Sequence, residues 1–505
     1  MAWLIAIARP MLGPQVAVVD PMLVALALLS TAFVLLAVVP VAAGVYQYLW
    51  IIPSGLATHL EQCQAATPRV SIIIPAWNEA AVIGLTIDRL MLLDYPRDCL
   101  RIYVIDDGSS DETPLIAIEK SKEYRGNVFH IRRVAGGEGK AHTLNYGLET
   151  LWRSEWTQAV LIMDADVIYT PSSLRKMARH FHDPTIGAVT AYIKEGSAEP
   201  NLVQRFITFE YITATGASRR AQNAMGFLAC LSGGAQLHSR ENLMAIGGEI
   251  FCQTLAEDTY TTFRTQLSGR KALFEPNAIV LAEEPDSLLM LWKQRLRWAR
   301  GNVQVTKDFA RLWFRPSKGG LGSFSMASIW FSVFLMPVFQ VTATIGLLTL
   351  YGIDEAWAWK AFHFLWIGSA AAYLIVTAAS AVVDPWSFAK SWWQGIMFPG
   401  VVSLGVIIGS LWPPLGALMT CWIPPGWPRS VGVVFLYLWP SLGMVAAYSA
   451  LLLEQSKRFS RLAAPMLYVA GYGAFLCSVT VGSYYKEWKG ASMTWDKTVK
   501  TGKIA

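Results

Sequence analysis

Charged residues are scarce in this sequence. Asp, Glu, Lys and Arg make up 15% of its 505 residues, whereas hydrophobic residues make up 53%. Ordinary soluble domains carry about 25% charged residues, so this composition excludes a wholly soluble enzyme and places part of the chain in a membrane. The net charge is only +6, and the sequence has no basic run long enough for a nucleic-acid-binding tail. We therefore assign the positive excess to loops that face membrane lipids and to an anionic substrate, and we expect no nucleic-acid partner.

Several common site signatures are also missing. The six cysteines include no Cys-x-x-Cys pair, which argues against a disulfide framework or a zinc site, and the seven histidines include no His-Glu-x-x-His motif. Residues 136–140 read Gly-Gly-Glu-Gly-Lys and invite comparison with a phosphate-binding P-loop. That comparison fails, because Val134 stands at the first glycine position and Ala141 stands where Ser or Thr holds magnesium.

Long apolar runs flank a more polar middle of the chain. Residues 1–19 are apolar but interrupted by prolines, which predicts an interfacial segment, and the uncharged run 22–50 predicts a first membrane helix. Beyond Ser325 the runs long enough to cross a bilayer are 326–351, 361–383, 395–422, 431–453 and 463–482. The predicted parts are therefore residues 1–50 (interfacial segment and first helix), 66–314 (cytoplasmic domain with interfacial helices), 326–482 (multi-helix channel region) and 483–505 (basic cytoplasmic tail).

The number of crossings bears on the side at which the lysine-rich tail ends. Five crossings after a cytoplasmic domain would put the tail outside, against the positive-inside tendency. The run 395–422 contains Pro399, Pro413 and Pro414, and we expect it to be broken or re-entrant. The remaining four crossings would return the tail to the cytoplasm and give a multi-pass protein of the plasma (inner) membrane.

The polar middle, from Arg69 to about Phe314, alternates strand-like and helical patterns in the order of a doubly wound α/β sheet. Apolar and β-branched runs predict strands at residues 70–74, 102–105, 128–132 and 186–191. Asp106 and Asp107 follow the second strand and open a polar turn before a helix. In such sheets a nucleotide binds at this position.

The stretch 160–169, Val-Leu-Ile-Met-Asp-Ala-Asp-Val-Ile-Tyr, places Asp164 and Asp166 where a buried strand ends. Residues i and i+2 of a strand point to the same side, so both carboxylates can converge on one hard cation that carries a diphosphate. The stretch therefore indicates an Mg²⁺ or Mn²⁺ site. The alternative, aspartates that start a turn and cap the next helix, stays open at this point.

Two later segments carry further candidates. Asp258 leads a helical pattern after Leu-Ala-Glu, and an ordinary N-cap is an equally good interpretation of it by itself. Residues 292–301 form a helical pattern on which Gln294, Arg297 and Trp298 share one face at i, i+3 and i+4. A basic amphipathic helix on an anionic membrane surface is the alternative for this segment.

Taken in order, these motifs resemble the D, D-x-D, D, Q-x-x-R-W signature of the processive membrane glycosyltransferases of family 2, a group that includes cellulose, chitin and hyaluronan synthases. The matching residues are Asp106 and Asp107, Asp164 and Asp166, Asp258, and Gln294, Arg295, Arg297 and Trp298. The resemblance implies an α/β, Rossmann-like, nucleotide-sugar-binding domain that is cytoplasmic and embedded between transmembrane helices. One departure is Ala256, because cellulose synthases carry Thr before the Glu-Asp pair.

On the donor side, the resemblance implies a nucleotide sugar, most simply linked to UDP, with Asp106 or Asp107 holding the uridine. Asp166, helped by Asp164, would coordinate Mg²⁺ or Mn²⁺ on the diphosphate, and Lys140 would contact the donor.

On the acceptor side, the resemblance makes Asp258 the general base of an inverting transfer. Arg295 and Arg297 would face the leaving diphosphate, and Trp298 would form the platform for the acceptor.

Three functions are compatible with this pattern. The first is a processive synthase that elongates and secretes a β-linked polysaccharide, with the growing glycan as acceptor. The second is a non-processive transferase that glycosylates a membrane lipid. The third is a transporter or scaffold that only binds a nucleotide sugar.

Overall fold

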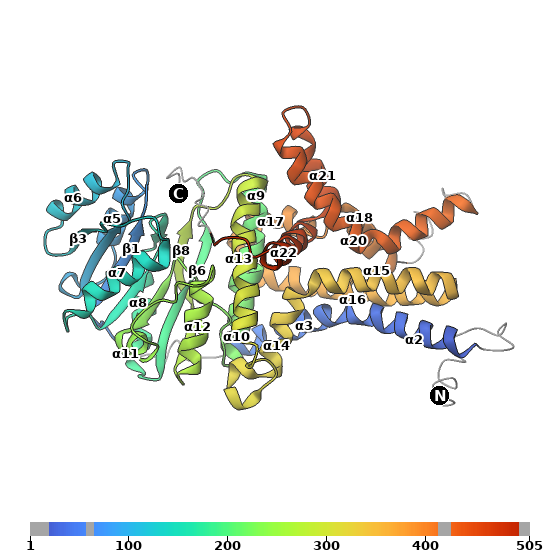
Figure 1. Ribbon diagram of the computed structural model, residues 1–505, viewed down its shortest axis with the longest axis horizontal. Coiled ribbons are helices and arrows are strands. Elements are labelled where there is room, and N and C mark those ends of the chain that lie inside the picture. Colours follow the sequence, from blue (N-terminus) through green and yellow to red (C-terminus); the bar gives the residue numbers. More distant parts are fainter. Residues whose placement is uncertain (1–19, 57–64, 413–425, 494–505) are drawn as a thin grey trace. The chain divides into compact units, whose positions relative to one another are not determined.

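The computed structural model describes residues 20–56, 65–412 and 426–493. The chain forms two compact units. A helical unit comprises Met1–Tyr46, Ser328–Ala379 and Trp392–Gly482, and an α/β unit comprises Gln47–Ala327, Ser380–Ser391 and Ser483–Ala505 (Figure 1). The expected interfacial segment at residues 1–19 and most of the lysine-rich tail lie outside the described residues.

Within the described part of the α/β unit, one mixed sheet has the strand order β3-β2-β1-β4-β7-β6-β8-β5. Its strands are β1 (Val70–Ala76), β2 (Leu100–Asp106), β3 (Val128–Arg132), β4 (Ala159–Ile162), β5 (Val167–Tyr169), β6 (Ile186–Glu195), β7 (Gln236–Ser239) and β8 (Lys271–Ala282). The first four are parallel, β7 runs antiparallel to both β4 and β6, and β5 runs antiparallel to β8. The α/β prediction is confirmed, and the sheet is mixed because the short β7 enters between β4 and β6 in the opposite direction.

Both faces of the parallel half of the sheet are covered by helices. Ile72 and Ile74 of β1 pack into a core with the buried side of α5 (Ile83–Met91), whereas Ile73 packs on the opposite face against α7 (Lys140–Trp152). A fully buried β1 explains the continuous apolar run in the sequence, because both faces of the strand are covered. The carboxyl ends of β1, β2 and β4 therefore remain as the open edge of this half of the sheet.

The helices of the α/β unit complete this frame and include the long helix that follows β8. They are α4 (Ile51–Leu56), α5, α6 (Thr113–Glu123), α7, α8 (Ser173–Ala178), α9 (Leu202–Glu210), a π-helical segment (Tyr211–Ala217), α10 (Ser218–Ala224), α11 (Arg240–Ala245), α12 (Glu257–Leu267) and α13 (Leu288–Asp308). The expected helices at Asp258 and at residues 292–301 correspond to α12 and α13.

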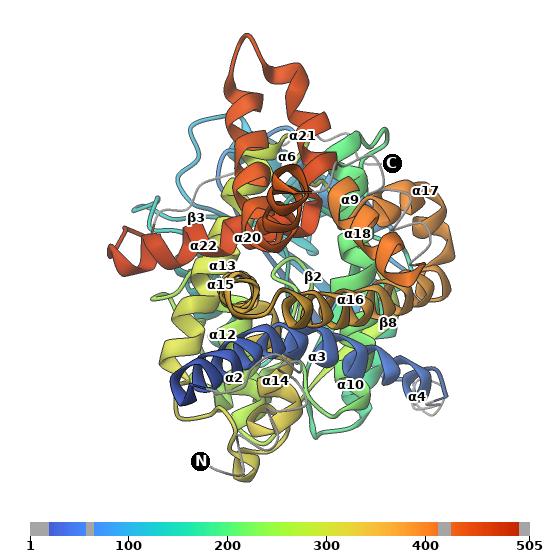
Figure 2. The same cartoon turned by 90° about the vertical axis from the view of Figure 1, so that its right-hand side faces the viewer.

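The helical unit is built from apolar helices, some of which continue into segments of the α/β unit. They are α2 (Pro21–Leu36), α3 (Val38–Leu49), α14 (Phe324–Phe334), α15 (Met336–Ile353), α16 (Glu355–Val383), α17 (Pro385–Ile396), α18 (Val401–Leu411), α20 (Trp427–Gln455), α21 (Ala463–Ala470) and α22 (Tyr472–Trp488). Helix α2 runs alongside α15, as both ribbon views show (Figures 1 and 2).

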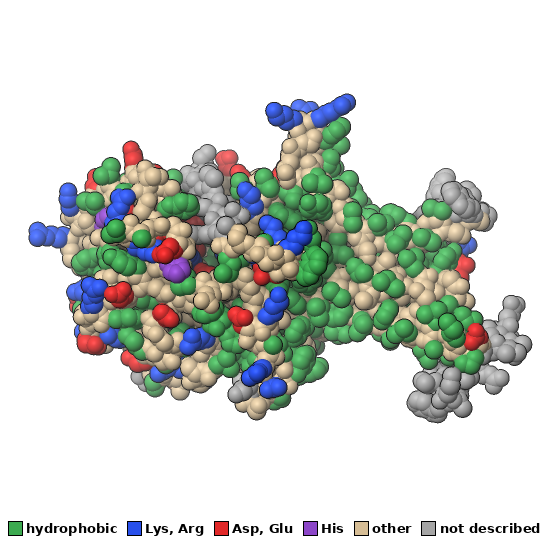
Figure 3. All heavy atoms as spheres, in the orientation of Figure 1, with side chains coloured by type: hydrophobic (Ala, Val, Ile, Leu, Met, Phe, Trp, Pro, Cys, Tyr) green, Lys and Arg blue, Asp and Glu red, His purple; other side chains and the backbone are tan. Residues whose placement is uncertain are grey.

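Among the described residues, four helical stretches are long and apolar enough to cross a membrane: Pro21–Pro53, Met336–Ile353, Glu355–Val383 and Arg429–Gln455. On the face drawn in Figure 3, hydrophobic side chains dominate the surface of α2, α15 and α16. The α17–α18 pair is bent by 86° and the α21–α22 pair by 99°. The first bend falls inside the run 395–422, in agreement with the expected broken segment, although residues 413–422 lie outside the described part.

The bend between α21 and α22 corrects the sequence interpretation, which took residues 463–482 as one simple crossing. The two bends contact each other through glycines with positive φ, Gly400 and Gly471. A Cβ added at Gly400 would lie 2.6 Å from the backbone nitrogen of Gly471, so a side chain cannot be accommodated there. Gly473 N–H donates a hydrogen bond to the carbonyl of Phe398 at 3.2 Å, which joins the two bent pairs through their backbones.

Candidate active site

The candidate donor residues gather at the carboxyl edge of β1, β2 and β4. β2 ends at Asp106, and β4 ends at Ile162, just before Asp164 and Asp166. The two latter aspartates lie in the turn between β4 and β5 rather than on a strand. The sequence interpretation therefore placed them at the correct edge, but its reason, the alternation of side chains along a strand, was wrong. Helix capping is not their role either, because Ser172 is the N-cap of the next helix, α8.

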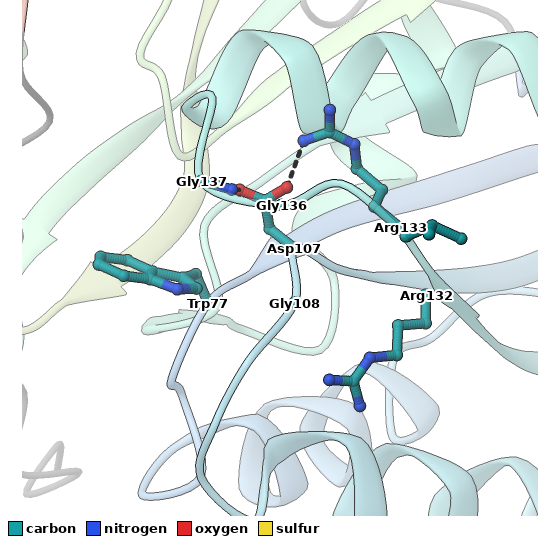
Figure 4. A pocket seen from close by; sticks show the side chains of 8 residues that line it. Trp77, Asp107, Gly108, Arg132, Arg133, Gly136 and Gly137 are labelled. Carbon is teal, nitrogen blue, oxygen red and sulfur yellow. Dashed lines mark hydrogen bonds and ion pairs between the residues drawn. The ribbon is translucent and has the colours of Figure 1, made fainter.

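Asp107 forms one wall of a cavity of about 570 Å³ at this edge (Figure 4). Its carboxylate pairs with the Arg133 guanidinium and accepts the Gly137 N–H at 3.0 Å. The cavity is lined by Trp77, Asp107, Gly108, Arg132, Arg133, Val134, Gly136 and Gly137. It combines an aromatic ring, two guanidinium groups and close backbone, which suits a planar, anionic ligand.

Asp106, the residue before Asp107, is fully buried. Its Oδ1 accepts the Ser109 N–H at 2.9 Å, and its Oδ2 lies 3.5 Å from Arg132 Nε and 3.9 Å from His130 Nε2. Burial lowers the pKa of His130, although Asp106 acts in the opposite direction. Asp106 therefore anchors the turn after β2, while Asp107 is the aspartate that lines the cavity.

Lys140 stands at the centre of a second cluster. Its Nζ lies 2.6 Å from Asp164 Oδ1 and 3.5 Å from Glu257 Oε1, and it donates a hydrogen bond to the carbonyl of Gly233 at 3.3 Å. Burial lowers the pKa of Lys140, but the carboxylates of Asp164, Glu257 and Asp258 outweigh burial and raise it overall. The ammonium group therefore stays charged and draws these carboxylates together.

Asp258 and Lys140 both lie close to Gly233. A Cβ added at Gly233 would lie 3.2 Å from Asp258 Oδ2 and 3.4 Å from Lys140 Nζ, so glycine keeps this gap open. The N-cap of α12 is Ala256, and the Asp258 carboxylate instead accepts the N–H of Thr259 at 2.6 Å. The N-cap interpretation of Asp258 is therefore wrong.

The electrostatic environment of Asp258 favours a proton acceptor. Burial raises the pKa of its carboxyl group and Glu257 raises it further, whereas Lys140 and Arg297 lower it. The Nε atom of Arg297 is buried and forms no hydrogen bond with any residue that the structure describes. Arg219, whose pKa is lowered by burial, donates a hydrogen bond to Ser232 and adds positive charge near Asp258.

Helix α13 carries Gln294, Arg295, Arg297 and Trp298, of which Arg297 acts electrostatically on Asp258. Arg295 donates two hydrogen bonds to the Glu210 carboxylate, at 3.1 and 2.9 Å, and its guanidinium stacks 4.1 Å from the ring centre of Trp298. Gln294 donates to Glu284 Oε2 at 3.2 Å. The ring of Trp298 is thus held from beneath while 37% of the residue's surface remains exposed. The guanidinium of Arg295 is bonded to Glu210 in this structure. The contact expected between Arg295 and a diphosphate stays a prediction.

All of these candidate site residues lie inside a segment that matches the sequence profile of a known protein family. Residues 68–301 match the profile described as "Glycosyltransferase like family 2". They form a family-2 glycosyltransferase domain. The match begins just before β1 and ends inside α13, and thus contains every candidate residue of the site. The α/β fold class and the family resemblance inferred from the sequence are confirmed for this domain.

Curated relatives of the glycosyltransferase domain include "Probable glycosyltransferase YdaM" of Bacillus subtilis, 32% identical over 53% of this chain and 63% of that protein. Poly-beta-1,6-N-acetyl-D-glucosamine synthase of Staphylococcus aureus is 30% identical over 48% of this chain and 56% of that protein. The alignments therefore span less than two thirds of either relative. Among solved structures, the mannosyltransferase PcManGT from Pyrobaculum calidifontis in complex with GDP-Man and Mn²⁺ aligns over 75% of this chain and 99% of its own, with a TM-score of 0.49 and 21% identity.

The glycosyltransferase domain offers a fitting donor set for a hard cation. Asp164 and Asp166 present carboxylate oxygens in one turn, the Asp164 side chain is 39% exposed, and oxygen donors are what Mg²⁺ and Mn²⁺ prefer. Among the described residues no group of three or more His, Cys, Asp or Glu side chains is gathered as a metal site. The aspartates would therefore hold the cation together with oxygens of a bound diphosphate.

Several residues of the site were missed by the sequence analysis. Trp77 and Arg133 line the cavity, Glu257 shares Lys140, and Glu210 and Glu284 hold the residues of α13. Glu257 carried a signal, since it directly precedes Asp258. Glu210 lies 85 residues before Arg295 in the sequence, so this contact depends on the tertiary fold.

Proposed function

We propose that this chain is an inverting, metal-dependent hexosyltransferase that elongates a β-linked polysaccharide from a nucleotide sugar and secretes it across the membrane. The observation that carries the proposal is the position of Lys140, whose Nζ lies 2.6 Å from Asp164 and whose charge interacts with Asp258, in a domain that also has a cavity suited to a nucleotide. In this proposal Asp258 is the acid–base group, and the turn with Asp164 binds the diphosphate.

In the proposed donor complex, the cavity around Asp107 takes the nucleoside, with UDP as the expected nucleotide. Lys140 would lie beside the diphosphate, and Asp164 and Asp166 would hold Mg²⁺ or Mn²⁺, which would supply positive charge to the leaving group. A sugar nucleotide departs as a diphosphate anion, so fixed positive charge aimed at that anion stabilises the transition state.

In the proposed transfer, the Asp258 carboxylate accepts the proton of the acceptor hydroxyl. The hydroxyl oxygen bonds to the anomeric carbon as the bond from that carbon to the diphosphate oxygen breaks. Attack opposite to the leaving group inverts the anomeric centre, so an α-linked donor gives a β-linked product. Lys140 and Arg297 favour the ionised form of Asp258, while burial makes it a stronger base.

A polymeric product is supported by the exposed ring of Trp298, which offers an apolar face on which a pyranose can stack. The polysaccharide synthase among the relatives supports the same reading. The apolar helices would carry the product, with the glycosyltransferase domain in the cytoplasm of a plasma (inner) membrane protein and membrane lipids as neighbours.

The test is to supply the purified full chain, in lipid nanodiscs with MgCl₂ or MnCl₂, with labelled UDP-glucose, UDP-N-acetylglucosamine, UDP-glucuronate or GDP-mannose, one at a time, and to size the product. A long glycan from one donor is expected. If the product is a single sugar on a lipid, the chain is a transferase with a lipid acceptor and not a polysaccharide synthase. If the donor binds but no sugar is transferred, the domain is a binding module.

A further inference from the structure

The end of helix α22 is fastened to α13 by a buried ion pair. Arg300 Nε lies 2.6 Å from Glu487 Oε1, and the same guanidinium donates hydrogen bonds to the carbonyls of Ser492 at 3.0 Å and Ala491 at 2.6 Å. The side chains of Arg300 and Glu487 are only 7% and 12% exposed. Every nitrogen of the guanidinium is therefore engaged by residues 487–492.

Gln304 lies one helical turn beyond Arg300, and its side-chain amide bonds both to Glu487 and to the loop before α12. Its Nε2 donates to both oxygens of Glu487, each at 3.3 Å, while its Oε1 accepts the N–H of Leu255 at 2.9 Å and the hydroxyl of Thr254 at 3.2 Å. One amide group thus joins the end of α22 to the loop that leads into α12.

The loop also packs directly on α13. A Cβ added at Gly301 would lie 2.5 Å from the Cβ of Ala256 and 2.8 Å from its backbone nitrogen. The helix and the loop therefore approach as closely as glycine allows. Glu257 and Asp258 are the next two residues after Ala256. Any shift of this loop therefore moves both carboxylates relative to Lys140.

From this chain of contacts we infer that Glu487 and Gln304 are positioning residues that set the place of Asp258 beside Lys140. The inference rests on the proposed function, since it assigns to these residues the geometry of that transfer. Neither side chain reaches the reacting groups. Their effect is on the rate of transfer after donor has bound, because Glu487 and Gln304 bond to α13 and to the loop before Asp258, whereas the cavity around Asp107 is lined by other residues.

The bonding pattern offers a variant pair that separates positioning from simple loss of stability. Glu487→Gln removes the carboxylate that receives Arg300 and Gln304. Gln304→Glu keeps the acceptor for Leu255 but sets a second carboxylate against Glu487. In the double variant Gln304→Glu with Glu487→Gln, the carboxylate at 304 accepts from Leu255 and the amide at 487 donates to it, so the bridge is restored with its groups exchanged.

The matched control is Glu275→Gln. Glu275 is fully buried and is bonded by Arg179 and His180, each at 2.8 Å, and it shares no hydrogen bond with the loop before Asp258. Like Glu487→Gln, the substitution Glu275→Gln removes a glutamate carboxylate from a buried hydrogen-bond network of the α/β unit. We expect this control to lower thermal stability while leaving the rate of transfer per folded molecule unchanged.

The experiment uses the full chain in nanodiscs and measures kcat and donor KM for transfer, together with calorimetric binding of UDP in MgCl₂. Displacing a reacting group by about 1 Å can lower a rate by about 10²-fold. We therefore expect each single variant to lower kcat by at least about 10-fold, with KM and UDP binding within about twofold of wild type, and the double variant to recover most of kcat.

Two results would overturn the inference. One is a pair of single variants that lose thermal stability but keep kcat, as the control does. The other is a double variant that folds and binds UDP yet stays as slow as the singles. Failure of the proposed function looks different, because wild type itself would then transfer no sugar from any of the four donors.

Discussion

Replacing Asp258 by Asn tests the proposed chemistry most directly. Asparagine keeps the size of the side chain and an oxygen that can accept the Thr259 N–H, which lies 2.6 Å from Asp258 Oδ1 in the structure. The first turn of α12 is therefore expected to be unchanged. What the substitution removes is the negative charge and the ability to take a proton.

The size of the effect follows from the surroundings of Asp258. Lys140 keeps two carboxylates, Asp164 at 2.6 Å and Glu257 at 3.5 Å, so the donor side of the site retains its charge balance and UDP should bind as before. A positioned general base contributes about 10²- to 10⁴-fold to a rate. Transfer should fall by at least about 10²-fold, which corresponds to roughly 3 kcal/mol in the activation barrier.

The assay measures incorporation of labelled sugar and, separately, UDP binding by calorimetry. Glu257→Gln is the matched control, because it removes the neighbouring carboxylate and leaves Asp258 in place. Transfer by Asp258→Asn within about threefold of wild type would refute the base assignment. A larger loss in Glu257→Gln than in Asp258→Asn would transfer that role to Glu257.

Four further predictions follow from the same structure. Asp166→Ala should abolish both transfer and its response to added Mg²⁺ or Mn²⁺, and transfer that persists in excess chelator would contradict the metal assignment. Trp298→Ala should yield short oligomers or none on a sizing gel while UDP binding is retained; a full-length product would exclude the ring as the acceptor platform. Glu275→Gln should lower the free energy of unfolding by about 2 kcal/mol at pH 7. Burial raises the pKa of Glu275, but the hydrogen bonds from His180 and Arg179 outweigh burial and lower this pKa overall. The stabilisation is therefore present above the unfolded pKa of about 4.3 and is lost as pH falls through the lower pKa of the folded state. Thermal scans in which the variant and wild type differ as much at pH 3 as at pH 7 would contradict this. A cysteine at position 497, in the tail beyond the described residues, should resist an impermeant thiol reagent in intact cells, and labelling from outside would place the tail there.

The parallel half of the glycosyltransferase domain could be predicted from sequence because its strands are apolar and β-branched runs, of which β1 and β4 are buried along their whole length. The predicted strand at residues 128–132 is β3 itself, and the strand at residues 70–74 lies within β1. β7 escaped prediction because Gln236–Ser239 is short and mixes polar with apolar residues, although all of it is buried. Its pairing with β4 is a long-range contact that no local pattern encodes.

The candidate site was predictable where the fold uses a general rule and unpredictable where it depends on individual contacts. Asp106, Asp107 and Asp164 follow strands whose carboxyl ends meet at one edge, so their grouping could be foreseen. The engagement of Arg295 by Glu210 could not, because the two residues are far apart in sequence. Hydropathy likewise treats residues 463–482 as uniform and takes no account of the left-handed backbone of Gly471, at which the helix bends.

The meeting of the two bent helix pairs has a consequence for the order in which the chain can be assembled. The Phe398 carbonyl accepts a hydrogen bond from Gly473, a residue that the ribosome adds 75 positions later. In the hydrocarbon of a bilayer an unpaired carbonyl costs several kcal/mol. For a chain that inserts in a bilayer, we therefore predict that the α17–α18 pair reaches its final position only after α21 and α22 have been made, so that late helices complete the insertion of an earlier pair.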